Sequence, residues 1–111
     1  MKNLLITAML FFMTPYVFGA CNSNSCYGTI DRIYLTHLST GEIWIRPSDS
    51  PSEVLNCNLR EGVYMTLKQN HMLFDEIYSA ALAALASQKE VNLRIAENSD
   101  DCELVYLMID S

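Results

Sequence analysis

The feature that most restricts the fold is one alanine-rich helical segment inside a chain of short alternating segments. From Asn70 to about Ser87 the spacing of apolar residues predicts a helix, with Asn70 as its N-cap. On both sides of this segment apolar and polar residues alternate with a period of two, which is typical of strands that bury one face. The chain is therefore expected to be mainly β with one helix.

Three strand regions are expected before the helix and two after it. In the first, residues 29–37, Ile33 and Leu35 share one face and Ile30 is out of phase, so a β-bulge is needed to bring Ile30 to the core. In the second, residues 42–46, Ile43 and Ile45 point to one face. The other strands are expected at residues 54–59 with 63–67, 91–95 and 103–109.

The predicted order of elements is β-β-β-α-β-β. A five-stranded, partly open barrel with its helix between the third and fourth strands is the OB-fold arrangement. An SH3-like barrel is the alternative, but that fold would not need a helix of about five turns at this point. The sequence therefore predicts one OB-fold domain over residues 21–111.

The first 20 residues have the features of a secretory signal peptide. Lys2 supplies a positive start, and the apolar run 4–13 is too short to cross a bilayer and ends before Pro15. Small residues favour cleavage after Gly19 or after the next residue, while lipid attachment at Cys21 is the alternative. No other segment is long enough to span a membrane. We therefore expect a secreted or periplasmic protein.

All four cysteines follow this segment. An even number of cysteines in an exported protein indicates disulfides, and four cysteines allow three connectivities. We expect Cys57 to pair with Cys102, which would tie the third strand region to the fifth, and Cys21 to pair with Cys26. Metal binding is the alternative, but there is no C-x-x-C pair and no histidine beside a cysteine. No metal is therefore expected.

The charge and the polar motifs exclude several classes of function. Without the leader, six basic side chains face thirteen acidic ones, so a nucleic-acid partner is not expected. His37 and His71 stand outside any recognisable catalytic motif, so neither an enzyme nor a cofactor is expected. The acidic stretch 97–101 lacks the spacing of a calcium loop and is expected to be a solvated turn.

Three aromatic residues are candidates for a binding site. If Ile43 and Ile45 face the core, Trp44 faces outward, and Tyr64 and Tyr34 alternate in the same way. Outward aromatic rings can stack on sugars or anchor a protein. The alternative is a small hydrophobic cluster covered by a loop such as residues 47–52.

The helix carries two apolar stripes, which together exceed the usual apolar sector of a surface helix. One stripe is expected to cap the open end of the barrel: Met72, Leu73, Ile77, Ala80 and Ala84. The other is expected to contact another copy of the chain: Phe74, Tyr78, Ala81, Leu82 and Leu85. The alternative is that loops, the N-terminal residues or a disulfide cover this second stripe.

Four stretches resemble a group of small exported bacterial proteins: "GTIDRIYLTHLSTGEIWIRP", "LNCNL", "FDEIYSAALAALASQKEVNLRI" and "DDCELVYLMI". Their shared pattern is a helix reading M-Y-x-x-x-L-A-A, a turn with lysine, a β-branched strand and a cysteine before the last strand. The residues that fit it are Ile77, Tyr78, Leu82, Ala83, Ala84, Lys89 and Cys102.

Proteins with this pattern look like the B subunits of AB5 toxins, particularly the subtilase-cytotoxin type. The resemblance implies an OB-fold, a homo-oligomeric ring and a glycan ligand. That toxin type contacts its glycan with a serine before the glycine of the first strand, whereas Tyr27 precedes Gly28 here. The second hypothesis is a structural or accessory envelope protein that binds another protein through the apolar helix face.

Overall fold

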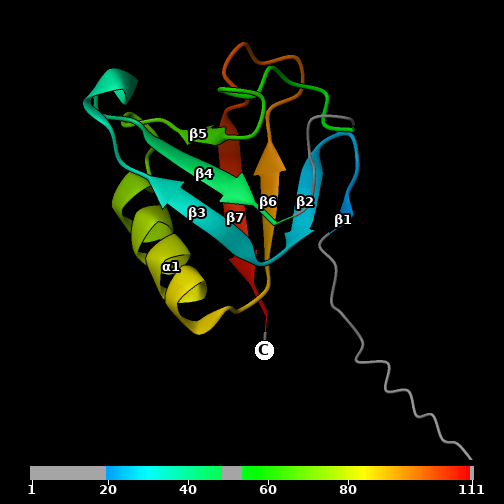
Figure 1. Cartoon of the computed structure of the whole chain (residues 1–111), viewed down its shortest axis with the longest axis vertical. Helices are drawn as coiled ribbons and strands as arrows, with labels where there is room; N and C mark the ends of the chain where they lie inside the picture. The colour runs from blue at the N-terminus through cyan, green and yellow to red at the C-terminus, as the bar shows by residue number, and fades with distance from the viewer. Residues whose placement is uncertain (1–19, 49–53, 111) are drawn as a thin grey trace, which may run out of the picture.

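The structure is a computed structural model and describes residues 20–48 and 54–110 (Figure 1). It is mainly β, with two antiparallel sheets and one helix. Sheet A has the order β1-β2-β6-β7, and its strands are Ala20–Cys21, Ser25–Gly28, Val91–Ile95 and Leu104–Ile109. Sheet B has the order β3-β4-β5, and its strands are Ile30–Tyr34, Ile43–Pro47 and Met65–Leu67.

β2 and β3 follow each other directly and carry the chain from one sheet to the other. β2 belongs to sheet A and β3 to sheet B, and only Thr29 separates them. Gly28 has a φ of 151°, a conformation that L side chains rarely adopt, so a glycine permits the change of direction. The register between β3 and β4 shifts between Ile30 and Arg32, and Ile30 is fully buried. The predicted bulge at Ile30 is therefore confirmed.

The two sheets meet again at their other ends. An isolated parallel bridge joins Thr66 in β5 to Glu103, beside the start of β7. The hydrogen bond from Thr66 N to the Cys102 carbonyl oxygen is 3.0 Å long. Because this contact is a single bridge, the hydrogen-bonded ladder does not continue around a closed barrel.

The core fills the space between the two sheets and is covered by α1, Phe74–Ser87, which packs on β3 and β7 (Figure 1). Three residues of α1 are buried and recur with helical spacing: Ile77, Ala81 and Ala84. The fully buried side chains of the strands come from both sheets: Ile30, Ile45, Met65, Leu67, Val91, Leu93, Ile95 and Leu104.

The N-cap lies three residues later than the sequence predicts. Leu73 occupies the N-cap position, and no side chain caps it, so the prediction of Asn70 as N-cap is wrong. His71 explains the difference, because its Nδ1 accepts a hydrogen bond from Leu73 N and its Nε2 lies 2.7 Å from the Val105 carbonyl oxygen. These bonds fix residues 71–73 as a turn against β7. At the other end the backbone of Gln88 is in the left-handed conformation, and its N–H donates to the carbonyl oxygens of Ala84 and Leu85.

Two strand predictions are wrong. Leu35 is 58% exposed, because β3 ends at Tyr34 and a 3-10 helix, η1 (His37–Ser39), follows. Residues 54–59 form no strand, since their backbone groups bond other loops: Asn56 N donates to Ser23 O, and Asn58 N donates to Ser99 O. By contrast, β6 has the predicted bounds, 91–95.

The hairpin of β1 and β2 is not predicted by the sequence pattern. Asn22 makes its turn, since Oδ1 accepts hydrogen bonds from the backbone of Asn24 and Ser25. β2 then pairs with β6 over its whole length, which makes sheet A four-stranded. The polar stretch between the first two cysteines gives no alternation that would predict a strand.

Candidate functional site

The outer face of sheet B carries the aromatic residues that the sequence singles out. Tyr34 pairs with Trp44 across β3 and β4, and Trp44 pairs with Thr66 across β4 and β5. The rings of Tyr34, Trp44 and Tyr64 form a cluster with centroids 5.5–5.7 Å apart. Aromatic pairs at this separation stabilise one another through offset or edge contacts. The structure thus brings all three predicted residues together.

The prediction that these aromatic rings are exposed is wrong for Trp44 and Tyr64. Trp44 lies opposite the core face of β4, but it is only 7% exposed, and Tyr64 is 3% exposed. Each ring contacts the other two, while Tyr34 remains partly accessible. Of the three residues, only Tyr34 can offer a substantial surface for a ligand to contact. The predicted covering loop lies mostly in residues 49–53, which are outside the described residues.

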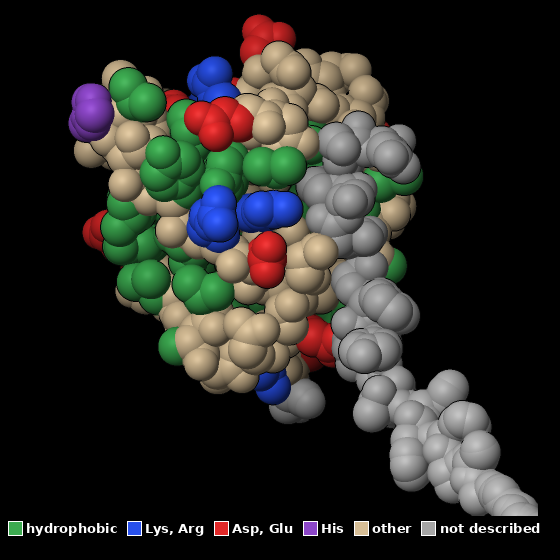
Figure 2. Space-filling model, in the orientation of Figure 1, with side chains coloured by type: hydrophobic (Ala, Val, Ile, Leu, Met, Phe, Trp, Pro, Cys, Tyr) green, Lys and Arg blue, Asp and Glu red, His purple; other side chains and the backbone are tan. Residues whose placement is uncertain are grey.

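Two arginines lie beside the aromatic cluster and were not predicted as site residues. Arg32 pairs with Arg46 across β3 and β4, so both side chains project from the outer face of sheet B. Arg32 donates a hydrogen bond of 3.1 Å to Tyr64 Oη, which raises the pKa of Arg32. Arg46 Nε lies 3.7 Å from a carboxylate oxygen of Asp31. Figure 2 shows two basic groups side by side over β3 and β4, with hydrophobic side chains next to them.

Two buried polar atoms on this face have no hydrogen-bond partner among the described residues. They are Trp44 Nε1 and Thr66 Oγ1, which belong to directly paired residues. An unpaired buried polar group costs about 1–3 kcal/mol, so such atoms mark places where a fold is not optimised for stability alone. The described residues enclose no cavity of ligand size, so any ligand here would bind on the surface.

The predicted interface residues of the helix do not form one exposed stripe. Ala81 is fully buried, and Phe74, Tyr78 and Leu85 are partly buried against the core, so only Leu82 is substantially exposed, at 41%. The stripe predicted to cap the barrel is also wrong in part. Met72 and Leu73 precede the helix and are exposed, whereas Ile77 and Ala84 are buried. Met72 and Leu73 are exposed because the helix begins only at Phe74, so these two residues do not follow the helical projection.

Exposed apolar residues nevertheless lie just before α1, on α1 and along β7. The contact between His71 and the Val105 carbonyl joins the two elements, and β7 is an edge of sheet A. We call this the α1–β7 surface; its exposed residues are Met72, Leu73, Leu82, Val105, Met108 and Ile109. Exposed apolar side chains beside an edge strand favour association with another protein.

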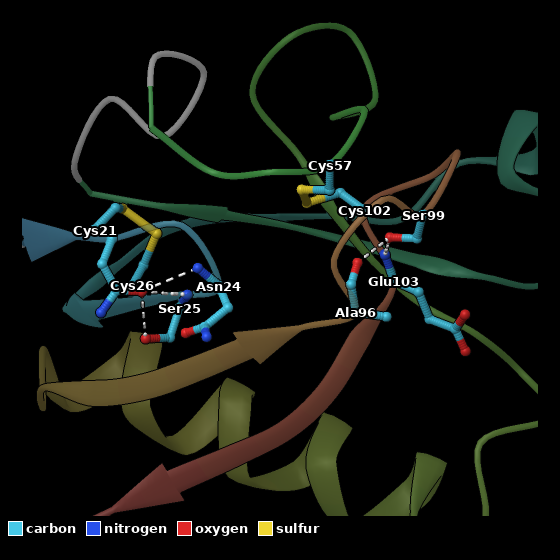
Figure 3. The surroundings of a disulfide bond; sticks show 10 residues. Cys21, Asn24, Ser25, Cys26, Cys57, Ala96, Ser99, Cys102 and Glu103 are labelled. Carbon is cyan, nitrogen blue, oxygen red and sulfur yellow. Dashed lines mark hydrogen bonds between the residues drawn. A yellow bond between two sulfur atoms is a disulfide. The ribbon is translucent and has the colours of Figure 1, made fainter.

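Two disulfides are present, with the pairing that the sequence analysis expected. Cys21 and Cys26 are directly opposite each other in β1 and β2. Cys57 and Cys102 join the loop before β5 to the turn before β7, two residues ahead of Leu104 (Figure 3). Ser99 supports this second junction, because its hydroxyl donates to Ala96 O and accepts a hydrogen bond from Glu103 N. Both disulfides are compatible with an oxidising compartment.

The prediction that the acidic stretch 97–101 is a solvated turn is wrong at Asp101. Asp101 is 7% exposed, and its carboxylate forms an ion pair of 2.9 Å with Lys68 Nζ. The hydrogen bond to Asp101 and the charge of this carboxylate raise the pKa of Lys68. The pair links the end of β5 to the turn before β7, so it supports the junction of the two sheets.

This ion pair predicts a specific pH dependence of stability. Because folding raises the pKa of Lys68, the stabilisation is complete below the unfolded value of about 10.5 and is lost as the pH rises through the folded value. Lys68→Gln should therefore lower the urea midpoint at neutral pH but converge with wild type at high pH. Lys89→Gln, at an exposed lysine after α1, is the control and should show no such convergence. Parallel curves for wild type and Lys68→Gln would contradict the assignment.

The remaining candidate residues have structural contacts. His71 holds β7, and His37 begins η1. Tyr27, which replaces the serine expected from the resemblance, lies on β2, and its hydroxyl donates a hydrogen bond of 3.0 Å to Glu90, which raises the pKa of Tyr27. In the described ranges no three potential metal ligands gather, and no helix there is long and apolar enough to cross a bilayer.

Comparison of the chain with family models, with curated proteins and with solved structures found no match.

Proposed function

We propose that this chain is a secreted, disulfide-stabilised binding module without enzymatic activity, built on an OB-fold and working as a homo-oligomer. In this proposal the α1–β7 surface contacts another copy of the chain, and the outer face of sheet B faces the ligand. The role is similar to that of an AB5 toxin B subunit, which the resemblance of the sequence implies.

The connectivity supports the OB-fold part of the proposal. β2 and β3 meet in a bend at Gly28 and Thr29, so this continuous segment belongs to both sheets. The third region, β5, lies parallel to the start of the last strand at the bridge from Thr66 to Glu103. The helix follows β5 in sequence and covers one end of the core. This arrangement agrees with a five-stranded, partly open barrel.

The α1–β7 surface is the observation that carries the homo-oligomer. Three of its exposed apolar residues lie on the edge strand: Val105, Met108 and Ile109. An edge strand offers unpaired backbone groups, and natural proteins usually protect such edges with charged side chains. Here β7 carries none between Leu104 and Ile109. A second copy would cover both the apolar side chains and the free edge.

Introducing negative charges on this surface should dissociate the oligomer. We expect Leu82→Glu combined with Val105→Glu to raise the dissociation constant at least about tenfold, because burying apolar area contributes about 25 cal/mol per Å² and 1.4 kcal/mol corresponds to a factor of ten. Sedimentation velocity of the purified protein at micromolar concentration measures the change.

Leu38→Glu is the matched control for this experiment. Leu38 is 64% exposed but lies on η1, outside the α1–β7 surface, so its substitution should leave the sedimentation coefficient unchanged. A wild-type protein that sediments as a monomer would refute the homo-oligomer. In that case the apolar helix end, with Met72 at 89% exposed, favours the second candidate, an accessory envelope protein that binds a different protein there.

A further inference from the structure

We propose that the outer face of sheet B binds a small ligand carrying one carboxylate on a ring, with Arg32 and Arg46 holding the carboxylate and Tyr34 contacting the ring. This inference rests on the proposed role as a binding module, but it does not depend on self-association. The proposed site consists of two neighbouring guanidinium groups and an accessible aromatic ring, which lie over buried polar atoms.

The two arginines can accept an anion together. Their residues are directly paired, so their Cβ atoms lie about 4.5–5.5 Å apart. Arg32 donates a hydrogen bond to the neutral phenol of Tyr64, and the ion pair of Arg46 with Asp31 is long and solvent-exposed. Each guanidinium has five N–H donors, so both retain donors for a planar, bidentate anion.

The charge balance selects the class of ligand. Two arginines and Asp31 leave one positive charge at this end of the face, which a single carboxylate neutralises. At the other end Lys68 is surrounded by Asp101 and Glu42, so the acidic group of a ligand is repelled from there. The whole chain has a formal charge of −6, which disfavours polyanions. A monocarboxylate oriented toward Arg32 and Arg46 fits these conditions best.

The centre of the face has unused hydrogen-bonding capacity. Trp44 and Thr66 are more than nine-tenths buried, and Trp44 Nε1 and Thr66 Oγ1 have no partner in the described part of the chain. The Tyr64 ring, which contacts Trp44, is attached to Arg32 by the hydrogen bond of its hydroxyl. When Arg32 turns to a carboxylate, its hydrogen bond to the Tyr64 hydroxyl is lost, and the packing of the Tyr64 ring on Trp44 can change. Binding should therefore change the surroundings of Trp44.

Fluorescence can test this inference, because Trp44 is the only tryptophan. The purified protein is titrated with methyl β-glucuronide and with benzoate, each beside its uncharged counterpart, methyl β-glucoside or benzyl alcohol. We expect a saturable fluorescence change with at least one acid and none with its neutral counterpart. The acid that responds distinguishes a sugar ring from an aromatic ring as the carrier of the carboxylate.

Matched substitutions assign the signal to the face. Arg32→Gln and Arg46→Gln should each weaken binding at least about tenfold, the factor expected for a charge-assisted hydrogen bond of 1.4 kcal/mol or more. Arg94→Gln removes the same charge from β6 of sheet A and should leave the affinity unchanged. Circular dichroism confirms that the variants are folded, and Arg32→Lys, which keeps the charge but not the planar fork, should bind with intermediate affinity.

Three results would overturn the inference: no response to either acid, equal responses to an acid and its neutral counterpart, or unchanged affinity in both arginine variants. The Leu82→Glu/Val105→Glu protein separates this inference from self-association. If this protein is monomeric and still binds the acid, the ligand site is independent of assembly. If wild type is a monomer but binds the acid, the homo-oligomer is refuted and the ligand site is supported.

Discussion

Replacing Cys57 and Cys102 together by alanine is expected to lower the free energy of unfolding by about 4 kcal/mol. The disulfide closes a segment with a sequence separation of 45, and the loop-entropy relation gives about this value for that length. Since single domains have a total stability of only about 5–15 kcal/mol, the loss would remove much of the margin. Equilibrium unfolding in urea measures it.

The structural position of this disulfide adds to the expectation. It holds the loop at residues 54–60 against the turn that leads into β7, where the hydrogen bond from Thr66 N to Cys102 O joins the two sheets. Loss of the disulfide should therefore loosen the contact between β5 and β7 before the rest of the fold. Hydrogen exchange at Thr66 N should accelerate more than exchange at the amides of β6.

The disulfide of Cys21 and Cys26 provides a matched control. It closes a separation of only five residues, for which the same relation gives about 2 kcal/mol. It also lies in the terminal hairpin of sheet A and contacts no part of β5 or β7 through its backbone pairing. A larger loss from Cys21→Ala/Cys26→Ala than from the other pair would show that loop closure does not govern the stability of this chain.

Local patterns predicted the elements that have one buried and one open face. The alternation around Leu93 and Ile95 fixed β6, because one of its faces is packed and the other is partly solvated. Ile30 is out of phase with the alternation of the residues that follow it. This predicted the bulge, since only a register shift could bury that residue. Both results follow from a side-chain period of two, which is a property of the backbone.

Alternation could not predict how much of the outer face of sheet B is covered. It places Trp44 opposite Ile43 and Ile45, as observed, but exposure depends on residues distant in sequence. Tyr64 arrives from beyond the loop after β4, and its ring covers the face that the pattern marks as outward. The same limit applies to α1, because the contact of His71 with β7 decides where the helix begins. Such tertiary contacts leave no periodic signal.

Trp44→Ala should destabilise the fold by about 3–5 kcal/mol, the range for truncating a buried aromatic residue. The substitution would leave a cavity beside the Tyr34 and Tyr64 rings and remove two aromatic contacts. Trp44→Phe keeps one ring and also removes the unpaired Nε1, so it should cost only about 1 kcal/mol. Urea midpoints of the two variants measure the difference.

Tyr27→Ala is the control for loss of an aromatic ring on an exposed sheet face. Tyr27 is 43% exposed on β2, and we expect a cost of about 1 kcal/mol or less. If Trp44→Ala were no more destabilising than Tyr27→Ala, the indole would be free on the surface, as alternation alone indicates. A large loss would instead mean that Trp44→Ala cannot serve as a test of ligand binding, since reduced binding would follow from unfolding. The exposed Arg32 and the half-buried Arg46 are the residues through which binding on this face can be tested without removing part of the aromatic cluster.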